Sequence, residues 1–108
     1  VLIPVQPSPY DVWASAEMVS LIREAQVFRP ALRAAFVINR RVSTTVIGRE
    51  ARSALADQPL PSLLSEVRQR IVFADSVARG QLALELDVDS MAAREIAALA
   101  NEVLRMAR

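Results

Sequence analysis

The feature that most constrains the fold is residues 1–11, where an apolar run passes directly into a proline-rich segment. Residues 1–5 read Val-Leu-Ile-Pro-Val without alternation, which is typical of a strand buried on both faces in a parallel sheet. Pro7 and Pro9 then fix their own φ angles and push the preceding residues toward extended conformations. We therefore expect a buried strand, a stiff loop at its carboxyl end, and a helix capped by Asp11.

Strand-like and helix-like segments alternate along the rest of the chain. Apolar residues at helical spacing predict four helices, at about 12–26, 47–55, 71–78 and 92–103. Buried apolar runs predict strands at 33–39 and 60–67, and we expect the short apolar piece 82–86 to be extended. The N-cap candidates of the second helix are Ser43, Thr44 and Thr45, and Gly80 is a plausible C′ glycine.

This order predicts an α/β fold in which helices flank a parallel sheet. Three strands with their helices form half of a doubly wound sheet. Because the chain also opens inside a buried strand, we expect residues 1–108 to be the second half of a larger domain.

The composition excludes several kinds of chemistry within this chain. It contains neither Cys nor His, which removes disulfides, thiolate nucleophiles and Ser-His-Asp triads and is compatible with a reducing cytoplasm. Every basic residue is Arg, and Gly48 and Gly80 are the two glycines, so there is no GxxxxGK[ST] phosphate loop. No apolar run approaches the roughly 20 residues that cross a bilayer.

Polar residues follow the predicted strands at the edge of the sheet where ligands bind in open α/β folds. Asn39 and Arg40 end the second strand, and an Asn amide offers both a donor and an acceptor to a base. Val67 and Arg68 leave the third strand at the same edge. The alternative is structural, with Asn39 as a turn residue and Arg68 at a solvated helix start.

Three segments together resemble the ParA-type partition ATPases, especially their short ParF-like branch. They are residues 3–12 (Ile-Pro-Val-Gln-Pro-Ser-Pro-Tyr-Asp-Val), residues 36–40 (Phe-Val-Ile-Asn-Arg), and residues 66–85 with Arg70, Phe73, Ala74, Asp75 and Gly80 in order. The resemblance extends over essentially the whole chain. It implies that residues 1–108 are the carboxyl-terminal half of a P-loop NTPase-like domain whose Gly-rich loop lies in the other half.

The resemblance also implies an activity and partners. Proteins of this family are ATPases that use ATP and Mg²⁺, form homodimers or filaments, and bind DNA nonspecifically. They partition plasmids or chromosomes with a ParB-like or centromere-binding partner protein. The implied location is cytoplasmic, on the nucleoid or plasmid of a bacterium, and not at a membrane. Since the phosphate and Mg²⁺ ligands of the family are absent here, we expect no catalysis by this chain alone.

The resemblance assigns roles to residues as well. Asn39, Arg40, Val67 and Arg68 are expected at the nucleotide, and the loop residues Pro7, Ser8 and Pro9 at a subunit interface. A nonspecific DNA surface would use Arg41, Arg49 and Arg52. No residue of this chain is expected to be catalytic or to bind metal.

Two other functions fit the same sequence. One is a non-enzymatic α/β interaction module that binds a partner through the proline loop and the Arg-rich middle of the chain. The other is a MinD-like ATPase that positions a different cargo, although the last helix has no basic amphipathic face for a membrane.

Overall fold

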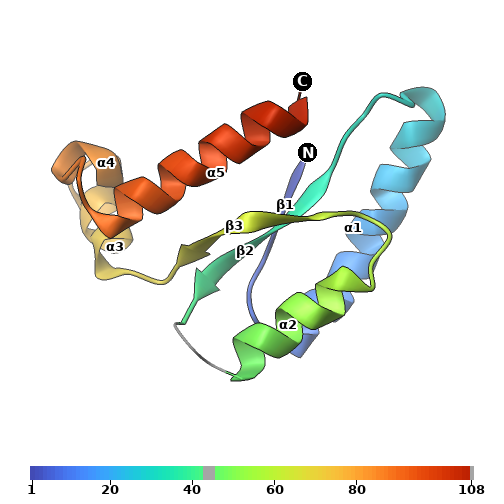
Figure 1. The fold of residues 1–108 in the computed structure, drawn as a ribbon, viewed down its shortest axis with the longest axis horizontal. Helices are drawn as coiled ribbons and strands as arrows, with labels where there is room; N and C mark the ends of the chain where they lie inside the picture. The colour runs from blue at the N-terminus through green and yellow to red at the C-terminus, as the bar shows by residue number, and fades with distance from the viewer. Residues whose placement is uncertain (43–45, 108) are drawn as a thin grey trace.

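Figure 1 shows the computed structural model, which describes residues 1–42 and 46–107. Within these ranges the elements are β1 (Leu2–Val5), α1 (Pro9–Phe28), β2 (Ala35–Arg41), α2 (Val46–Ala56), β3 (Ser62–Arg68), α3 (Ile71–Ala78), α4 (Ala83–Leu86) and α5 (Met91–Ala107). The N-cap candidates Ser43, Thr44 and Thr45 lie outside the described residues. Among the described helices, none combines the length and the apolar content that a membrane crossing requires.

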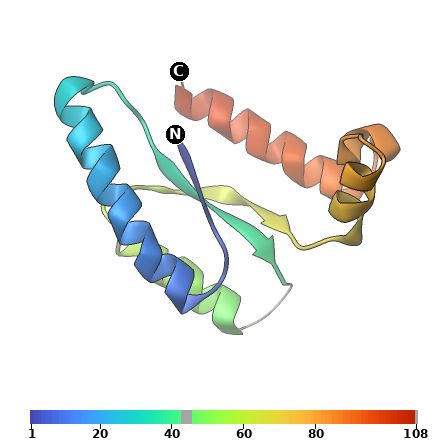
Figure 2. The same ribbon diagram turned by 180° about the vertical axis from the view of Figure 1, so that it is seen from behind.

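The strands form a parallel sheet in the order β1-β2-β3. Val5 lies opposite Ile38, and Phe36 lies opposite Ser62. Helices α1 and α2 cover one face of the sheet and α5 covers the other, as the two opposite views in Figures 1 and 2 show. The predicted α/β fold with a parallel sheet and flanking helices is confirmed.

A hydrophobic core lies on each face of the sheet. Apolar side chains from alternate strand positions pack against α1 and α2 on one face, namely Ile3, Val5, Phe36 and Ile38 against Val12, Val19, Ile22, Ala51 and Leu55. The smaller core beneath α5 consists of Ala35, Val37 and Leu63 with the partly buried Leu99, Val103 and Met106. Because strand side chains alternate between faces, one short strand serves both cores.

The prediction that the first strand is buried on both faces is wrong for the residues that the structure describes. Ile3 and Val5 are buried, whereas Leu2 is 37% exposed and Pro4 is also exposed. The physical reason is the position of α5, which packs chiefly on β3 and leaves the same face of β1 uncovered.

The prediction that Asp11 caps the first helix is also wrong. The helix begins at Pro9, and Ser8 occupies the N-cap position with extended backbone angles. Proline suits the first helical position because its φ is already helical and its missing N–H is not needed there. Asp11 lies in the first turn, where its Oδ2 accepts the Gln6 backbone N–H at 2.9 Å.

Residues 82–86 are not extended, because Ala83–Leu86 form the short helix α4. The Glu85 carboxylate accepts the Leu82 backbone N–H at 2.8 Å, which satisfies a donor at the start of the turn. Ala, Leu and Glu also have high helix propensity, which the apolar pattern alone does not reveal.

Gly80 ends α3 as the sequence predicts. Its φ is +65°, and its backbone N–H donates to the Val77 carbonyl at 3.0 Å. The Gln81 N–H donates to the Ser76 carbonyl at 2.8 Å, which completes a Schellman motif.

We predict that Gly80→Ala lowers the free energy of unfolding by about 1 kcal/mol, because an alanine is strained at this positive φ. No atom lies within 4 Å of an added Cβ, so the loss is conformational rather than steric. Urea denaturation measures it. Gly80→Asn is the matched control and should lose less, since Asn tolerates the left-handed region. Equal stability of Gly80→Ala and the unmodified protein would contradict this assignment.

Candidate functional site

A pocket of about 830 Å³ opens at the carboxyl ends of the strands, between the sheet, α3 and α5. Its lining comes from every strand, from the segment after β3 and from α5, and consists of Pro4, Val37, Asn39, Arg40, Val67, Arg68, Gln69, Arg70, Ile71, Phe73, Ala74, Ile96 and Leu99. We call it the edge pocket. All four residues predicted at a nucleotide line it, although they come from two strands. Their binding of a nucleotide stays a prediction.

The edge pocket has the composition of a small-molecule site. Its volume lies within the range of ligand pockets, roughly 300 to 1,000 Å³. Val37, Val67 and Phe73 are among the residues that provide apolar surface, while Asn39 and Arg68 contribute polar groups. Apolar walls with a few convergent polar groups can hold a flat, partly polar molecule such as a nucleotide base.

Backbone irregularity shapes the pocket at Arg40. Between Ile38 and Arg41, β2 advances three residues while β3 advances two, from Glu66 to Arg68, so β2 carries an extra residue. Arg40 has a φ of +57°, which costs a non-glycine residue about 1 to 2 kcal/mol. Such β-bulges redirect side chains next to binding sites. No local pattern predicts this bulge, since an Asn-Arg-Arg strand end is compatible with regular pairing.

Glu95 of α5 binds Arg68 and Arg70, two of the three arginines that line the pocket. Glu95 accepts from Arg70 through two bonds, Nε to Oε1 at 3.1 Å and Nη2 to Oε2 at 3.0 Å. The Arg68 backbone N–H donates to Glu95 Oε1 at 3.3 Å, and Arg68 Nε lies 3.6 Å from Oε2. Burial raises the pKa of Glu95, but the bonds from Arg70 and Arg68 outweigh it and leave this pKa below its ordinary value.

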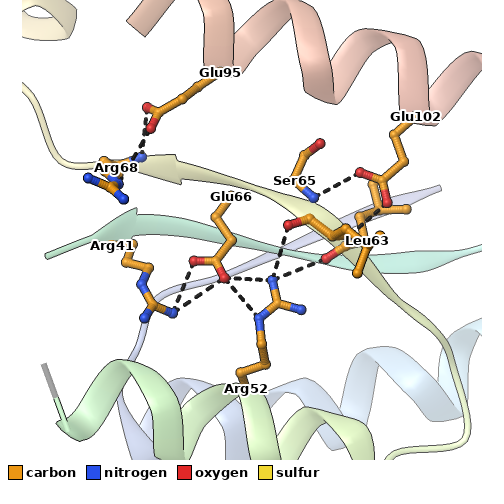
Figure 3. Close-up of polar contacts among 9 residues, drawn as sticks. Arg41, Arg52, Leu63, Ser65, Glu66, Arg68, Glu95 and Glu102 are labelled. Atoms are coloured by element: carbon orange, nitrogen blue, oxygen red, sulfur yellow. Dashed lines mark hydrogen bonds and ion pairs between the residues drawn. The ribbon is translucent and has the colours of Figure 1, made fainter. Parts of the chain in front are cut away.

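A second carboxylate of α5 binds the edge of β3. Glu102 Oε1 accepts the Leu64 N–H at 2.6 Å, and its Oε2 accepts the Ser65 N–H at 2.8 Å. Burial raises the pKa of Glu102, and hydrogen bonds from Ser65 and Leu64 lower it further than burial raises it. Figure 3 shows both carboxylates reaching down from α5 to β3.

The predicted DNA-binding arginines are only partly free. Arg41 Nη1 lies 3.0 Å from Glu66 Oε2, and Arg52 Nη2 lies 2.7 Å from Glu66 Oε1 (Figure 3). These side chains are 16% and 32% exposed, whereas Arg49 is exposed on α2. One carboxylate thus neutralises part of the positive charge of the pair. DNA contact by the three arginines stays a prediction.

The predicted interface loop lies where β1 passes into α1. Pro7 and Ser8 are half-buried, and Pro9 is exposed at the first position of the helix. Tyr10 and Trp13 follow on the exposed side of α1, with their ring centroids 5.5 Å apart and their rings nearly perpendicular. The loop and this aromatic pair are accessible to a partner, and the interface role stays a prediction.

In residues 1–42 and 46–107, no group of three or more His, Cys, Asp or Glu side chains is placed to hold a metal ion. The residues of the edge pocket fit a base better than a cation.

The sequence of this chain is similar to that of a known protein. No family model matches the chain. It is 34% identical over 105 residues to the Maintenance of carboxysome distribution protein A of Halothiobacillus neapolitanus (strain ATCC 23641 / c2). The similarity supports the ParA/MinD superfamily of ATPases. It covers 96% of this chain and 49% of the relative, so the chain spans about half the length of that protein. It does not support the narrower ParA or ParF groups.

Sequence reasoning missed the part of the site that α5 supplies. Glu95, Ile96 and Leu99 lie at least 25 residues beyond the strand residues that they approach. Spacing along one helix places Glu95, Leu99 and Glu102 on neighbouring turns of a single face. That pattern was a usable signal for a helix that contacts a polar strand edge.

We predict that the two α5 carboxylates, Glu95 and Glu102, make the free energy of unfolding decrease as the pH falls into the acidic range. Their folded pKa values lie below the unfolded value of about 4.3, so their stabilisation is full above that pH and is lost as pH falls through the folded pKa. Glu102→Gln should lower the free energy of unfolding at pH 7 by about 1 kcal/mol and flatten its decline between about pH 5 and 3.

Urea denaturation over that pH range measures the effect. Glu17→Gln is the matched control, because Glu17 is exposed on α1. An unchanged acid profile for Glu102→Gln would contradict the role of this carboxylate.

We predict that Arg40→Gly raises the free energy of unfolding by about 1 kcal/mol, because glycine adopts the positive φ without strain. Arg49→Gly should instead lower it by a similar amount, about 1 kcal/mol, since Arg49 lies within α2. Thermal and urea unfolding of both variants test this. A destabilised Arg40→Gly protein would show that the Arg40 side chain stabilises the fold more than its backbone strain costs.

Proposed function

We propose that this chain is the base-binding, carboxyl-terminal half of a ParA/MinD-type ATPase domain. The observation that carries the proposal is the edge pocket, which gathers Asn39, Arg40, Val67 and Arg68 at the carboxyl ends of two strands. Ligands of open α/β sheets bind at that edge. The similarity to a superfamily relative, which extends beyond the half matched by this chain, supports the same function.

In this proposal the apolar walls of the edge pocket enclose an adenine base. The Asn39 amide is half-buried at the pocket and can donate to one atom of the base edge while accepting from another. Val67 limits the space beside the base, and Arg68 and Arg40 supply donors at the opening. The phosphate groups and Mg²⁺, which neutralises phosphate charge during hydrolysis, would be held by residues outside this chain.

We further propose that the ATPase positions a cargo through nucleotide-dependent association of two copies. The loop at Pro7, Ser8 and Pro9 would contribute to the contact between subunits, and Arg49 with Arg41 and Arg52 would contact DNA phosphates. The relative is named for carboxysome distribution, which favours a protein body as the cargo over a plasmid or chromosome. An adaptor in the place of a ParB-like protein would connect ATPase and cargo.

We predict that Asn39→Ala weakens ATP binding by the intact protein about tenfold, the cost of losing hydrogen bonds to a base. Titration of a fluorescent ATP analogue measures the dissociation constant. Asn101→Ala is the matched control, because Asn101 is exposed on α5 and does not line the edge pocket. If Asn39→Ala and Asn101→Ala bind the analogue equally well, the base does not contact Asn39.

A further inference from the structure

We propose that Glu95 is a positioning residue of the edge pocket, which fixes the guanidinium plane of Arg70 so that Arg70 stacks on the face of the bound base. This inference rests on the proposed function and deepens it. It gives the site a recognition element that comes from α5.

Glu95 holds Arg70 through a bidentate ion pair. Both oxygens of the carboxylate accept from the guanidinium, through Nε at 3.1 Å and Nη2 at 3.0 Å. Two parallel bonds fix the plane of the group as well as its position, which a single bond would not do. The side chains are 25% and 17% exposed, so water competes with this pair less than with a surface pair.

Arg70 lies beside apolar residues of the edge pocket. It lines the pocket together with Ile71, Phe73 and Leu99. The pair with Glu95 uses two N–H groups in the plane of the guanidinium, so these bonds do not occupy either of its faces. A planar guanidinium stacks readily on a flat aromatic ring, and a nucleotide base is such a ring.

Glu95 is the carboxylate that contacts the closely spaced arginines Arg68 and Arg70. Arg40, Arg68 and Arg70 share the pocket, and their positive charges repel one another. Glu95 also accepts the Arg68 N–H, so one carboxylate holds both the backbone at Arg68 and the side chain of Arg70 in the segment that leaves β3. The following residue on α5, Ile96, lines the pocket itself. The docking of α5 therefore brings Ile96 to the lining of the pocket and Glu95 to Arg70 together.

The test is nucleotide binding by the intact protein with Glu95→Gln. We expect the dissociation constant for a fluorescent ADP analogue to rise about tenfold, the scale of a partly exposed charge-assisted bond. Glu17→Gln is the matched control. Glu17 is exposed on α1 and neither lines the pocket nor contacts Arg70, so this variant should keep the original dissociation constant.

Two further measurements separate positioning from a general structural role. The double variant Glu95→Gln/Arg70→Ala should bind no more weakly than Arg70→Ala alone, because Glu95 acts through Arg70. The affinity for adenosine, measured by competition, should fall by the same factor as the affinity for ADP, because the proposed contact is to the base. An adenosine affinity unchanged by Glu95→Gln would place the contact at the phosphates and overturn the stacking.

Arg70→Lys keeps the experiment decisive if Glu95→Gln does not fold. Lysine preserves the charge but has no planar group, so this variant should lose about as much affinity as Arg70→Ala. Full affinity in Arg70→Lys or in Glu95→Gln overturns the inference. The proposed function fails separately, through absence of nucleotide binding by the unmodified protein or equal binding by Asn39→Ala.

Discussion

The docking of α5 on β3 is the contact on which the candidate site depends. Glu95 and Glu102 project from one face of the helix and accept backbone N–H groups of Arg68, Leu64 and Ser65 along the outer edge of the strand. Unpaired strand edges invite pairing with other chains, and here carboxylates occupy part of that edge. Apolar packing of Leu99 beneath the helix completes the contact. The edge pocket forms because α5 lies beside the carboxyl ends of the strands and contributes Ile96 and Leu99 to its lining.

Two irregularities in the β2–β3 pairing make this arrangement possible. From Phe36 to Ile38 β2 advances two residues, while β3 advances four, from Ser62 to Glu66. The extra residues allow consecutive amides to point at Glu102, where a regular strand alternates their directions. Further along, the extra residue is Arg40 in β2, next to Asn39. Local departures from the ladder thus connect the anchoring of α5 with the shape of the pocket.

The sequence predicted features that follow from local patterns and missed those that depend on tertiary packing. The parallel sheet, the ends of β2 and β3 near the pocket, and Gly80 as C′ residue were readable from apolar runs and backbone preferences. Asp11 was misjudged because either Asp11 or Ser8 can cap a helix, and Pro9 decided between them by fitting the first turn. The one-sided burial of β1 and the role of Glu95 depend on where α5 packs. The face shared by Glu95, Leu99 and Glu102 indicates that α5 contacts a polar strand edge, but it does not show which strand that is.

The most direct test of the account is to locate the base itself. Photo-crosslinking of the intact protein with 8-azido-ATP, followed by digestion and mass spectrometry, identifies the residues beside the base. We expect labelling within residues 37–40 or 67–74, the two segments that contribute most of the lining of the edge pocket, and loss of labelling when unmodified ATP is in excess. Labelling confined to other segments, such as α1 or α2, would contradict the assignment of the base to this pocket.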